Sequence, residues 1–283
     1  MIMNSKKSQK IAFFLLLLAT LLIVVPVGLI VVIIIQKGIG AISWQFLTDI
    51  PRKGMREGGI FPAIVGTVYL VTGAIIFALP VGLLAAIYLS EYAKDNFVTR
   101  MIKLAIVNLA GVPSVVYGLF GLAIFVIFFK FGTSILAGSL TLGIMILPVI
   151  ITTSREALES VPYSFREASL SLGASKWQTI RHIVLPNAIP GIITGTILGI
   201  GRAAGETAPI LFTVAAFYLP LLPKGVFDQA MALPYHLYVI STQVPNVDEN
   251  IRYGTALVLL FLVLFMNLIA IIIRYKFRKQ KKW

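Results

Sequence analysis

Two ionisable residues one helical turn apart, Arg202 and Glu206, interrupt a long apolar region of the chain. They lie within Gly199–Pro209, and the apolar runs Ile189–Ile200 and Ile210–Phe217 flank them, which predicts one membrane-embedded segment. An arginine at the centre of a membrane helix costs about 2.5–3.5 kcal/mol on insertion scales. It persists where a partner, a water-filled cavity or an anionic substrate compensates for that cost. The pair therefore indicates a protein that handles an anion inside the bilayer.

The chemistry of this pair suits an oxyanion. The guanidinium of Arg202 is a permanent positive charge with a planar set of hydrogen-bond donors. Ser114, Tyr117 and Thr207 are expected to add neutral donors along the substrate path. Glu206 is expected to neutralise Arg202 in the resting state, so that an anion is released as well as bound. Two alternatives stay open: a salt bridge that only holds spans together, and a protonatable Glu206 in an ion-coupled carrier.

Composition places these residues in a polytopic membrane protein. Hydrophobic residues make up 58% of the 283 residues and charged residues only 12%, against roughly 45–50% and 25% in soluble domains. The net charge is +13. Because the basic residues lie between apolar runs and not on the face of a soluble domain, we expect contacts with lipid and no binding of nucleic acid. The chain has no cysteine and two histidines, His182 and His236, so no metal site is expected.

The apolar runs predict an all-α fold, a polytopic bundle of six transmembrane helices, because each run is long enough to cross a bilayer. The expected spans are Ile11–Ile35, Val65–Leu89, Val112–Phe129, Ile135–Ile151, Ala188–Phe217 and Gly254–Ile273. Pro80, Pro148 and Pro209 are expected to interrupt the helical pattern. The first run is longer than the apolar core of a cleaved signal peptide, so it is expected to stay as a helix.

Six crossings put both termini on one side of the membrane, and the basic residues select that side. Sixteen of the 24 lysines and arginines fall in the two tails and the loops on their side, and seven fall in the opposite loops. The positive-inside rule then predicts cytoplasmic termini in a plasma membrane. Residues 91–103 are expected to form an interfacial helix or a polar turn. Pro220–Asn250 is expected to be an ordered external loop over the outer mouth.

The longest cytoplasmic loop, from Thr153 to about Asn187, is predicted to contain two short helices joined by a turn at Gly173. The first helix follows Pro162, and the second lies within Ala174–Ile183. Such a surface suits docking of another protein or packing on the chain's own membrane domain. Its apolar positions are Phe165, Ala168, Leu172 and Trp177.

A spaced motif stands in this loop. It consists of Glu167-Ala168-Ser169, Gly173 after three more residues, and Ile183-Val184-Leu185-Pro186 after nine more. The motif resembles the signature loop of ABC importer permeases, Glu-Ala-Ala, three residues, Gly, nine residues and Ile-x-Leu-Pro, with Ser169 in place of the second alanine. Gly111–Gly118 and Gly201–Pro209 resemble the segments that set phosphate permeases apart, and the short N-terminus resembles that of their PstA-type subunit.

The resemblance covers the chain from about Val65 to Ile273 and implies a type I ABC importer permease fold with cytoplasmic coupling helices. It divides the chain into residues 1–63 (cytoplasmic tail, first transmembrane helix and external loop), 64–274 (permease domain) and 275–283 (basic cytoplasmic tail). The residues implied in ATPase coupling are Glu167, Ala168, Ser169, Gly173, Ile183, Leu185 and Pro186. Glu167 would face a basic residue of the ATPase, and Gly173 would permit the turn.

The resemblance also implies partners: a PstC-like permease subunit, two PstB-like ATPase subunits and a PstS-like phosphate-binding protein. The ATPase would use ATP and Mg²⁺, and this chain would bind no cofactor. No Gly-x-x-x-x-Gly-Lys-Ser/Thr segment and no nucleophile paired with a base occurs in the sequence, so no catalytic residue is expected. The first hypothesis is an ATP-driven phosphate importer that works by alternating access. A permease for molybdate or sulfate, an ion-coupled secondary anion transporter, and a scaffold or sensor remain as alternatives.

Overall fold

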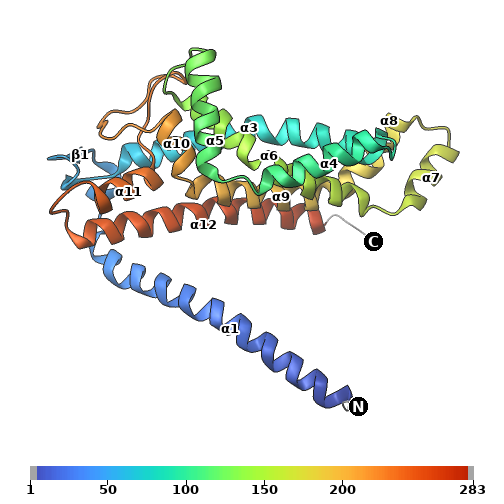
Figure 1. Ribbon diagram of the computed structural model, residues 1–283, viewed down its shortest axis with the longest axis horizontal. Coiled ribbons are helices and arrows are strands. Elements are labelled where there is room, and N and C mark those ends of the chain that lie inside the picture. The colour runs from blue at the N-terminus through green and yellow to red at the C-terminus, as the bar shows by residue number, and fades with distance from the viewer. Residues whose placement is uncertain (1–4, 280–283) are drawn as a thin grey trace.

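The computed structural model describes residues 5–279. Its core is a bundle of long helices that lie side by side along the long axis of the molecule (Figure 1). The bundle helices are α3 (Phe61–Ile87), α6 (Ile135–Glu159), α9 (Leu185–Gly205) and α12 (Glu249–Lys279). α3 and α6 make the most extensive interface, and α9 packs on α6 and on α12. The core between them contains fully buried aliphatic side chains such as Leu70, Leu142 and Ile146.

Two prolines inside the bundle leave its helices continuous. We expected Pro80 and Pro148 to interrupt the pattern, and this was wrong, because α3 and α6 run through them. Membrane helices tolerate proline where neighbouring groups satisfy the freed backbone.

The first helix, α1 (Ser5–Gly38), diverges from the bundle and meets it at one end (Figure 1). Its membrane-length apolar window buries nothing against the other described residues. Contact is made near its C-terminal end, where Gly38 lies against the backbone of Tyr253 in α12 and Lys37 pairs with Glu249 at 3.4 Å. α1 begins and α12 ends at the same end of the molecule (Figure 1), as an even number of crossings requires.

A sharp break precedes the third expected span. Residues 97–128 form α4 (Phe97–Ala110), then α5 (Ser114–Gly121) continued by η3 (Leu122–Phe128), with a 102° bend between α4 and α5. The expected span Val112–Phe129 corresponds to the continuous helix formed by α5 and η3, and Pro113 stands at the bend with an extended backbone that precedes α5. Asn96 caps α4 through its side chain, so residues 97–103 are helical. Five described helices are long and apolar enough to cross a membrane, or six if this bent pair counts as one.

The fifth expected span is broken. We expected Ala188–Phe217 to be one segment, but α9 ends at Gly205 and α10 (Ala208–Thr213) starts after two residues. Glu206 has an extended backbone, with φ −79° and ψ 133°. Pro209 lies in the first turn of α10, as was expected of an interrupting proline. The break places Glu206 between two helices, where its backbone groups are outside the helical ladder.

The end of the bundle that was expected to lie outside the cell is covered by an ordered layer, called the outer layer below. It contains η1 (Ile39–Ala41), α2 (Trp44–Thr48), the antiparallel strands β1 (Pro51–Arg52) and β2 (Glu57–Gly58), and α11 (Leu233–Thr242). Tyr218 donates to the carbonyl of Pro51 at 3.0 Å, and the amide of Leu233 donates to the hydroxyl of Thr67 at 2.8 Å. The segment Pro220–Asn250 is therefore ordered, as expected, and is hydrogen-bonded to α3, whereas its external position stays a prediction.

The layer approaches α3 at Gly66, where a side chain has no room. A Cβ at this position would collide with the carbonyl of Met231 and lie 3.1 Å from the Cβ of Ala230. We expect Gly66→Ala to destabilise the folded protein by about 1–3 kcal/mol, as overpacking does. Thermal unfolding in detergent measures the effect. Gly28→Ala in α1, where a Cβ would meet nothing within 4 Å, is the matched control, and equal melting temperatures of the two variants would contradict this account.

His236 makes the outer layer sensitive to acid. Its side chain on α11 is 3% exposed, and burial lowers the pKa of its imidazole to about 4. In the unfolded chain the imidazole titrates near pH 6.5, so the stability due to the neutral form is fully present above that pH and is lost towards pH 4. At pH 5 the expected loss is roughly 2 kcal/mol.

Thermal melts at pH 7.5 and pH 5 check this prediction. We expect His236→Leu to flatten the difference between the two melting temperatures, whereas His182→Leu, at an exposed site in the cytoplasmic loop, should keep it. An unchanged pH dependence in the His236 variant would show that other groups are responsible.

The opposite end of the bundle carries the loop that was expected to be cytoplasmic. It consists of α7 (Tyr163–Ser171), α8 (Lys176–Thr179) and η4 (Ile180–Val184), and it contacts η2 (Tyr88–Tyr92), which continues α3. Gly173 has φ +84°, a conformation that favours glycine. The first predicted helix and the glycine turn are confirmed, but the second helix is not a short separate one, because α8, η4 and α9 form one continuous helix over Lys176–Gly205. α6 extends to Glu159, so the loop itself starts later than the expected Thr153. Residues 280–283 of the expected basic tail lie outside the described residues.

Candidate anion site and coupling surface

Arg202 and Glu206 lie at the end of α9 and are paired. The Nε of Arg202 is 3.7 Å from Oε1 of Glu206, and their side chains are 31% and 22% exposed. This separation is longer than a hydrogen bond. The pair is therefore a loose one, and the guanidinium keeps the capacity to bind another anion.

The helix α5 brings a second predicted segment to the same break. A Cβ on Gly118 would lie 3.0 Å from both the carbonyl oxygen of Ala208 and the Cα of Pro209, so α5 and α10 approach through a glycine contact. The Tyr117 hydroxyl donates to the carbonyl of Leu109 at 2.7 Å. The structure thus brings α5, which carries Tyr117, against α10 next to the break that contains Glu206.

Ser114 and Thr207 stand at the starts of the two packed helices. Ser114 is the first residue of α5, and Thr207 precedes α10 without capping it through its side chain. Both are partly buried. Their positions beside the break agree with a role as neutral donors, and that role stays a prediction.

Asn267 of α12 is a polar neighbour of the site that the sequence reasoning missed. Its side-chain Nδ2 would lie 3.5 Å from a Cβ on Gly201, next to Arg202. Its Oδ1 is buried without a hydrogen-bond partner among the described residues. The signal was available, because an amide stands inside the apolar run Gly254–Ile273 and polar groups inside spans are costly.

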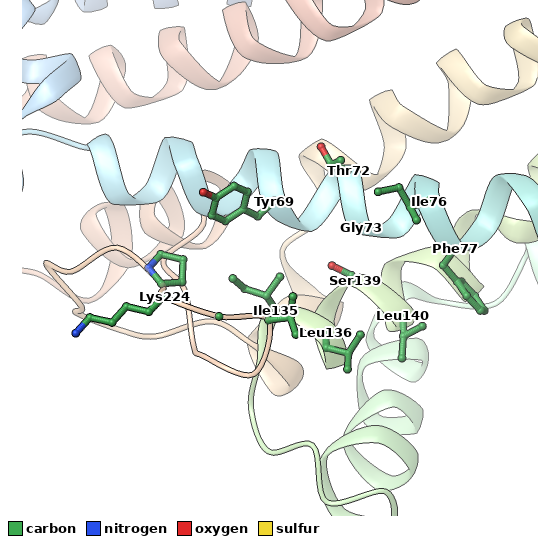
Figure 2. Close-up of a pocket in the computed structure, with 13 residues that line it drawn as sticks. Tyr69, Thr72, Gly73, Ile76, Phe77, Ile135, Leu136, Ser139, Leu140 and Lys224 are labelled. Carbon is green, nitrogen blue, oxygen red and sulfur yellow. The ribbon is translucent and has the colours of Figure 1, made fainter.

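A larger pocket lies elsewhere. This open pocket of about 620 Å³ is lined by α3, the start of α6 and residues 223–226, and its walls are mainly apolar (Figure 2). Figure 2 labels Tyr69, Ile76 and Phe77 from α3 and Leu136 and Leu140 from α6 along it. The space beside Glu206 is only about 10 Å³ and is bordered by α3, α9, α10 and α11. This void is too small to hold an oxyanion in this conformation, although the side chains of Arg202 and Glu206 remain partly exposed.

The expected coupling residues divide between the two sides of α7 and α8. Glu167, Ala168 and Gly173 are exposed, and Leu172 beside them is 89% exposed. Ser169 is turned inward, where its hydroxyl lies 2.9 Å from that of Thr179 and joins α7 to α8. The remaining three follow α8: Ile183 and Leu185 are half-buried, and Pro186 is exposed in the first turn of α9. The exposed members form one outward face.

With this geometry in view, comparison with known proteins identifies the fold's family. Residues 78–282 match the family of binding-protein-dependent transport system inner membrane components. The chain belongs to this family. It is an ABC importer permease, a multi-pass inner membrane component, and the resemblance found in its cytoplasmic loop is confirmed.

Individual relatives agree with the family. The chain is 37% identical to a probable ABC transporter permease protein, YqgI of Bacillus subtilis, over 86% of this chain and 87% of that protein. It is also 37% identical to the phosphate transport system permease protein PstA 1 of Mycobacterium tuberculosis, over 80% of this chain and 72% of that one. A crystal structure of a bacterial ABC transporter that imports the acidic polysaccharide alginate shares the fold, with TM-score 0.64, 14% identity and 98% of each chain covered.

Proposed function

We propose that this permease moves inorganic phosphate across the plasma membrane as the PstA-type subunit of an ATP-driven importer. The observation that carries the proposal is the meeting of α5 with the α9–α10 break around Arg202. Both segments are those that resemble phosphate permeases. Relatives named as phosphate permeases, at 34–38% identity over most of the chain, support the same substrate.

The proposed mechanism uses the residues at the break in turn. Phosphate carries between one and two negative charges near neutral pH, and Arg202 offers it a planar fork of donors. Tyr117, Ser114 and Thr207 supply neutral donors, and Glu206 competes for Arg202 so that the anion leaves. Because the extended backbone at Glu206 separates α9 from α10, a small change of angle there is expected to open the site to one side.

The proposed assembly places this chain beside a PstC-like permease, with two PstB-like ATPases and a PstS-like binding protein. Both termini would lie in the cytoplasm, so that α7 and α8 face the ATPase and the outer layer faces the binding protein. The chain itself would be non-catalytic, and ATP and Mg²⁺ would be used by the ATPase. The exposed face of Glu167, Ala168, Leu172 and Gly173 is the surface on which that partner would act.

Phosphate uptake by the reconstituted complex tests the proposal. Proteoliposomes containing this chain, its permease partner, the ATPase and the binding protein should import radioactive phosphate only with ATP, and excess sulfate or molybdate should not compete. Import of sulfate or molybdate instead of phosphate would reassign the substrate within the same family. Flux through this chain alone, driven by an ion gradient without ATP, would support a secondary transporter and overturn the proposal.

A further inference from the structure

A buried ion pair joins the cytoplasmic loop to the end of the first bundle helix. Arg166 of α7 contacts Glu91 of η2, 75 residues away in the sequence, through Nη2 at 2.7 Å from Oε1 and Nε at 3.3 Å from both carboxylate oxygens. The two side chains are 12% and 8% exposed. Among residues 9–277, whose side chains the structure describes, no other ion pair is buried on both sides to this degree.

Arg166 also holds the end of α6. Its Nη1 donates to the carbonyl of Val161 at 2.7 Å, and its Nη2 donates to that of Leu158 at 2.9 Å. Leu158 lies in the last turn of α6 and Val161 just beyond its end, where carbonyls lack the usual helical donor four residues on. One guanidinium therefore ties α7, η2 and the end of α6 together. A lysine cannot reproduce this, because it lacks the planar fork.

Further contacts around the Arg166–Glu91 pair join the loop to the ends of α3 and α6. The Nζ of Lys176 lies 4.8 Å from the ring centre of Tyr92, which connects α8 to η2. Ile87, Leu158 and Ile180 pack in a shared apolar cluster beneath the loop. The inner side of α7 and α8 is thus attached to α3 and α6, whereas the outer side is exposed.

The helix α3 runs from this attachment to the anion site. Its cytoplasmic end continues into Glu91, and its outer half supplies Thr67, Leu70 and Val71 to the small void beside Glu206. A displacement of α3 along its axis would therefore change the packing directly at the α9–α10 break.

We infer that the Arg166–Glu91 pair is the link that delivers movement of α7 to α3 during transport, so that both are positioning residues for coupling. Apolar contacts are non-directional and let packed helices slide. Separating a buried, multiply hydrogen-bonded charge pair instead leaves an unpaired desolvated charge, so the pair resists it. The inference rests on the proposed docking of the ATPase on α7.

Substitution of either partner tests the link. In the reconstituted complex, Glu91→Gln and Arg166→Gln are expected to lower ATP-driven uptake at least 10-fold while ATP hydrolysis stays within about 2-fold, so that the ATP consumed per phosphate rises at least 5-fold. Arg100→Gln is the matched control, because Arg100 pairs only with its near neighbour Asp95 at an exposed site. A wild-type ratio of ATP to phosphate in both Gln variants would overturn the inference.

Chemical cross-linking separates a mechanical link from a merely structural role. The chain has no cysteine, so Glu91→Cys/Arg166→Cys introduces a unique pair that a short bifunctional thiol reagent can join. We expect the unlinked double variant to be uncoupled and the linked one to regain at least half of the wild-type uptake per ATP. Equal coupling with and without the reagent would contradict the link. If the Gln variants do not assemble, the comparison of the linked with the unlinked double variant tests the inference in their place.

A measurement that needs no transported solute tests the link separately from the proposal that the substrate is phosphate. Tyr69 lies on the outer half of α3 and is 49% exposed. In the Tyr69→Cys variant, the rate at which an impermeant thiol reagent labels the introduced thiol is expected to change when ATP is added. Arg166→Gln should abolish that change. If the change occurs in a complex that imports no phosphate, the substrate proposal fails and the link stands. If it persists in Arg166→Gln, the link fails whatever the substrate.

Discussion

Replacing Arg202 by glutamine is expected to lower ATP-driven phosphate uptake on the order of 100-fold, while the complex still assembles and hydrolyses ATP. The reason is electrostatic, because an anion leaving water needs a fixed positive charge at the site beside α10. Losing one partner of a desolvated, hydrogen-bonded charge pair costs about 2–5 kcal/mol, and each 1.4 kcal/mol is a factor of ten. Initial rates of radioactive phosphate uptake in proteoliposomes measure the effect.

The control for this variant is another arginine at the interface of α9 and α12. Arg274, near the C-terminal end of α12, donates to Thr194 in the middle of α9 at 3.2 Å, away from the break. Arg274→Gln should keep uptake within about 3-fold of the wild type. If Arg202→Gln also transports normally, Arg202 and Glu206 are a structural pair and the anion uses another path.

Arg202→Lys refines the interpretation. It keeps the charge and loses the planar fork, so an anion bound through two parallel donors is expected to be transported several-fold more slowly. A carrier that needs only the charge would be unaffected. The comparison also tests the ion-coupled alternative, because a protonatable Glu206 would make uptake depend on a proton gradient and not on ATP.

Local signals explain what the sequence predicted correctly. Glycine at position 173 is needed where the backbone turns with φ +84°, and such a turn is fixed by a single residue. Arg202, Glu206 and Tyr117 stand out because charges and small residues interrupt apolar runs. The meeting of α5 with α10 could be expected only through the family resemblance, since the two helices are about 90 residues apart in the sequence.

What the sequence missed depends on packing between distant elements. Pro80 and Pro113 look alike in the sequence, yet α3 continues through the first and the chain bends by 102° at the second. The outcome is decided by neighbours such as α6 and α10, which no local pattern contains. Likewise Arg166 and Glu91 each read as ordinary surface charges, and only the fold of the loop onto η2 buries them.

Charge reversal at Glu167 is the second change expected to have a large effect. Glu167→Lys should reduce binding of the ATPase subunits and uptake at least 10-fold, because a like charge placed against a basic residue of the partner costs several kcal/mol. The side chain is exposed on α7, so the variant itself should insert and melt as the wild type does. Co-purification of the ATPase with the tagged permease, followed by uptake, measures both consequences.

Glu156→Lys on α6 provides the comparison, since it reverses another exposed carboxylate at the cytoplasmic end of the bundle. If that variant loses the ATPase equally, general electrostatics at this end control assembly and the outward face of α7 has no special role. If only Glu167→Lys loses it, binding is localised to the side of α7 opposite Arg166. In that case Glu167 would contact the ATPase, and its neighbour Arg166 would transmit the resulting movement of α7 to α3.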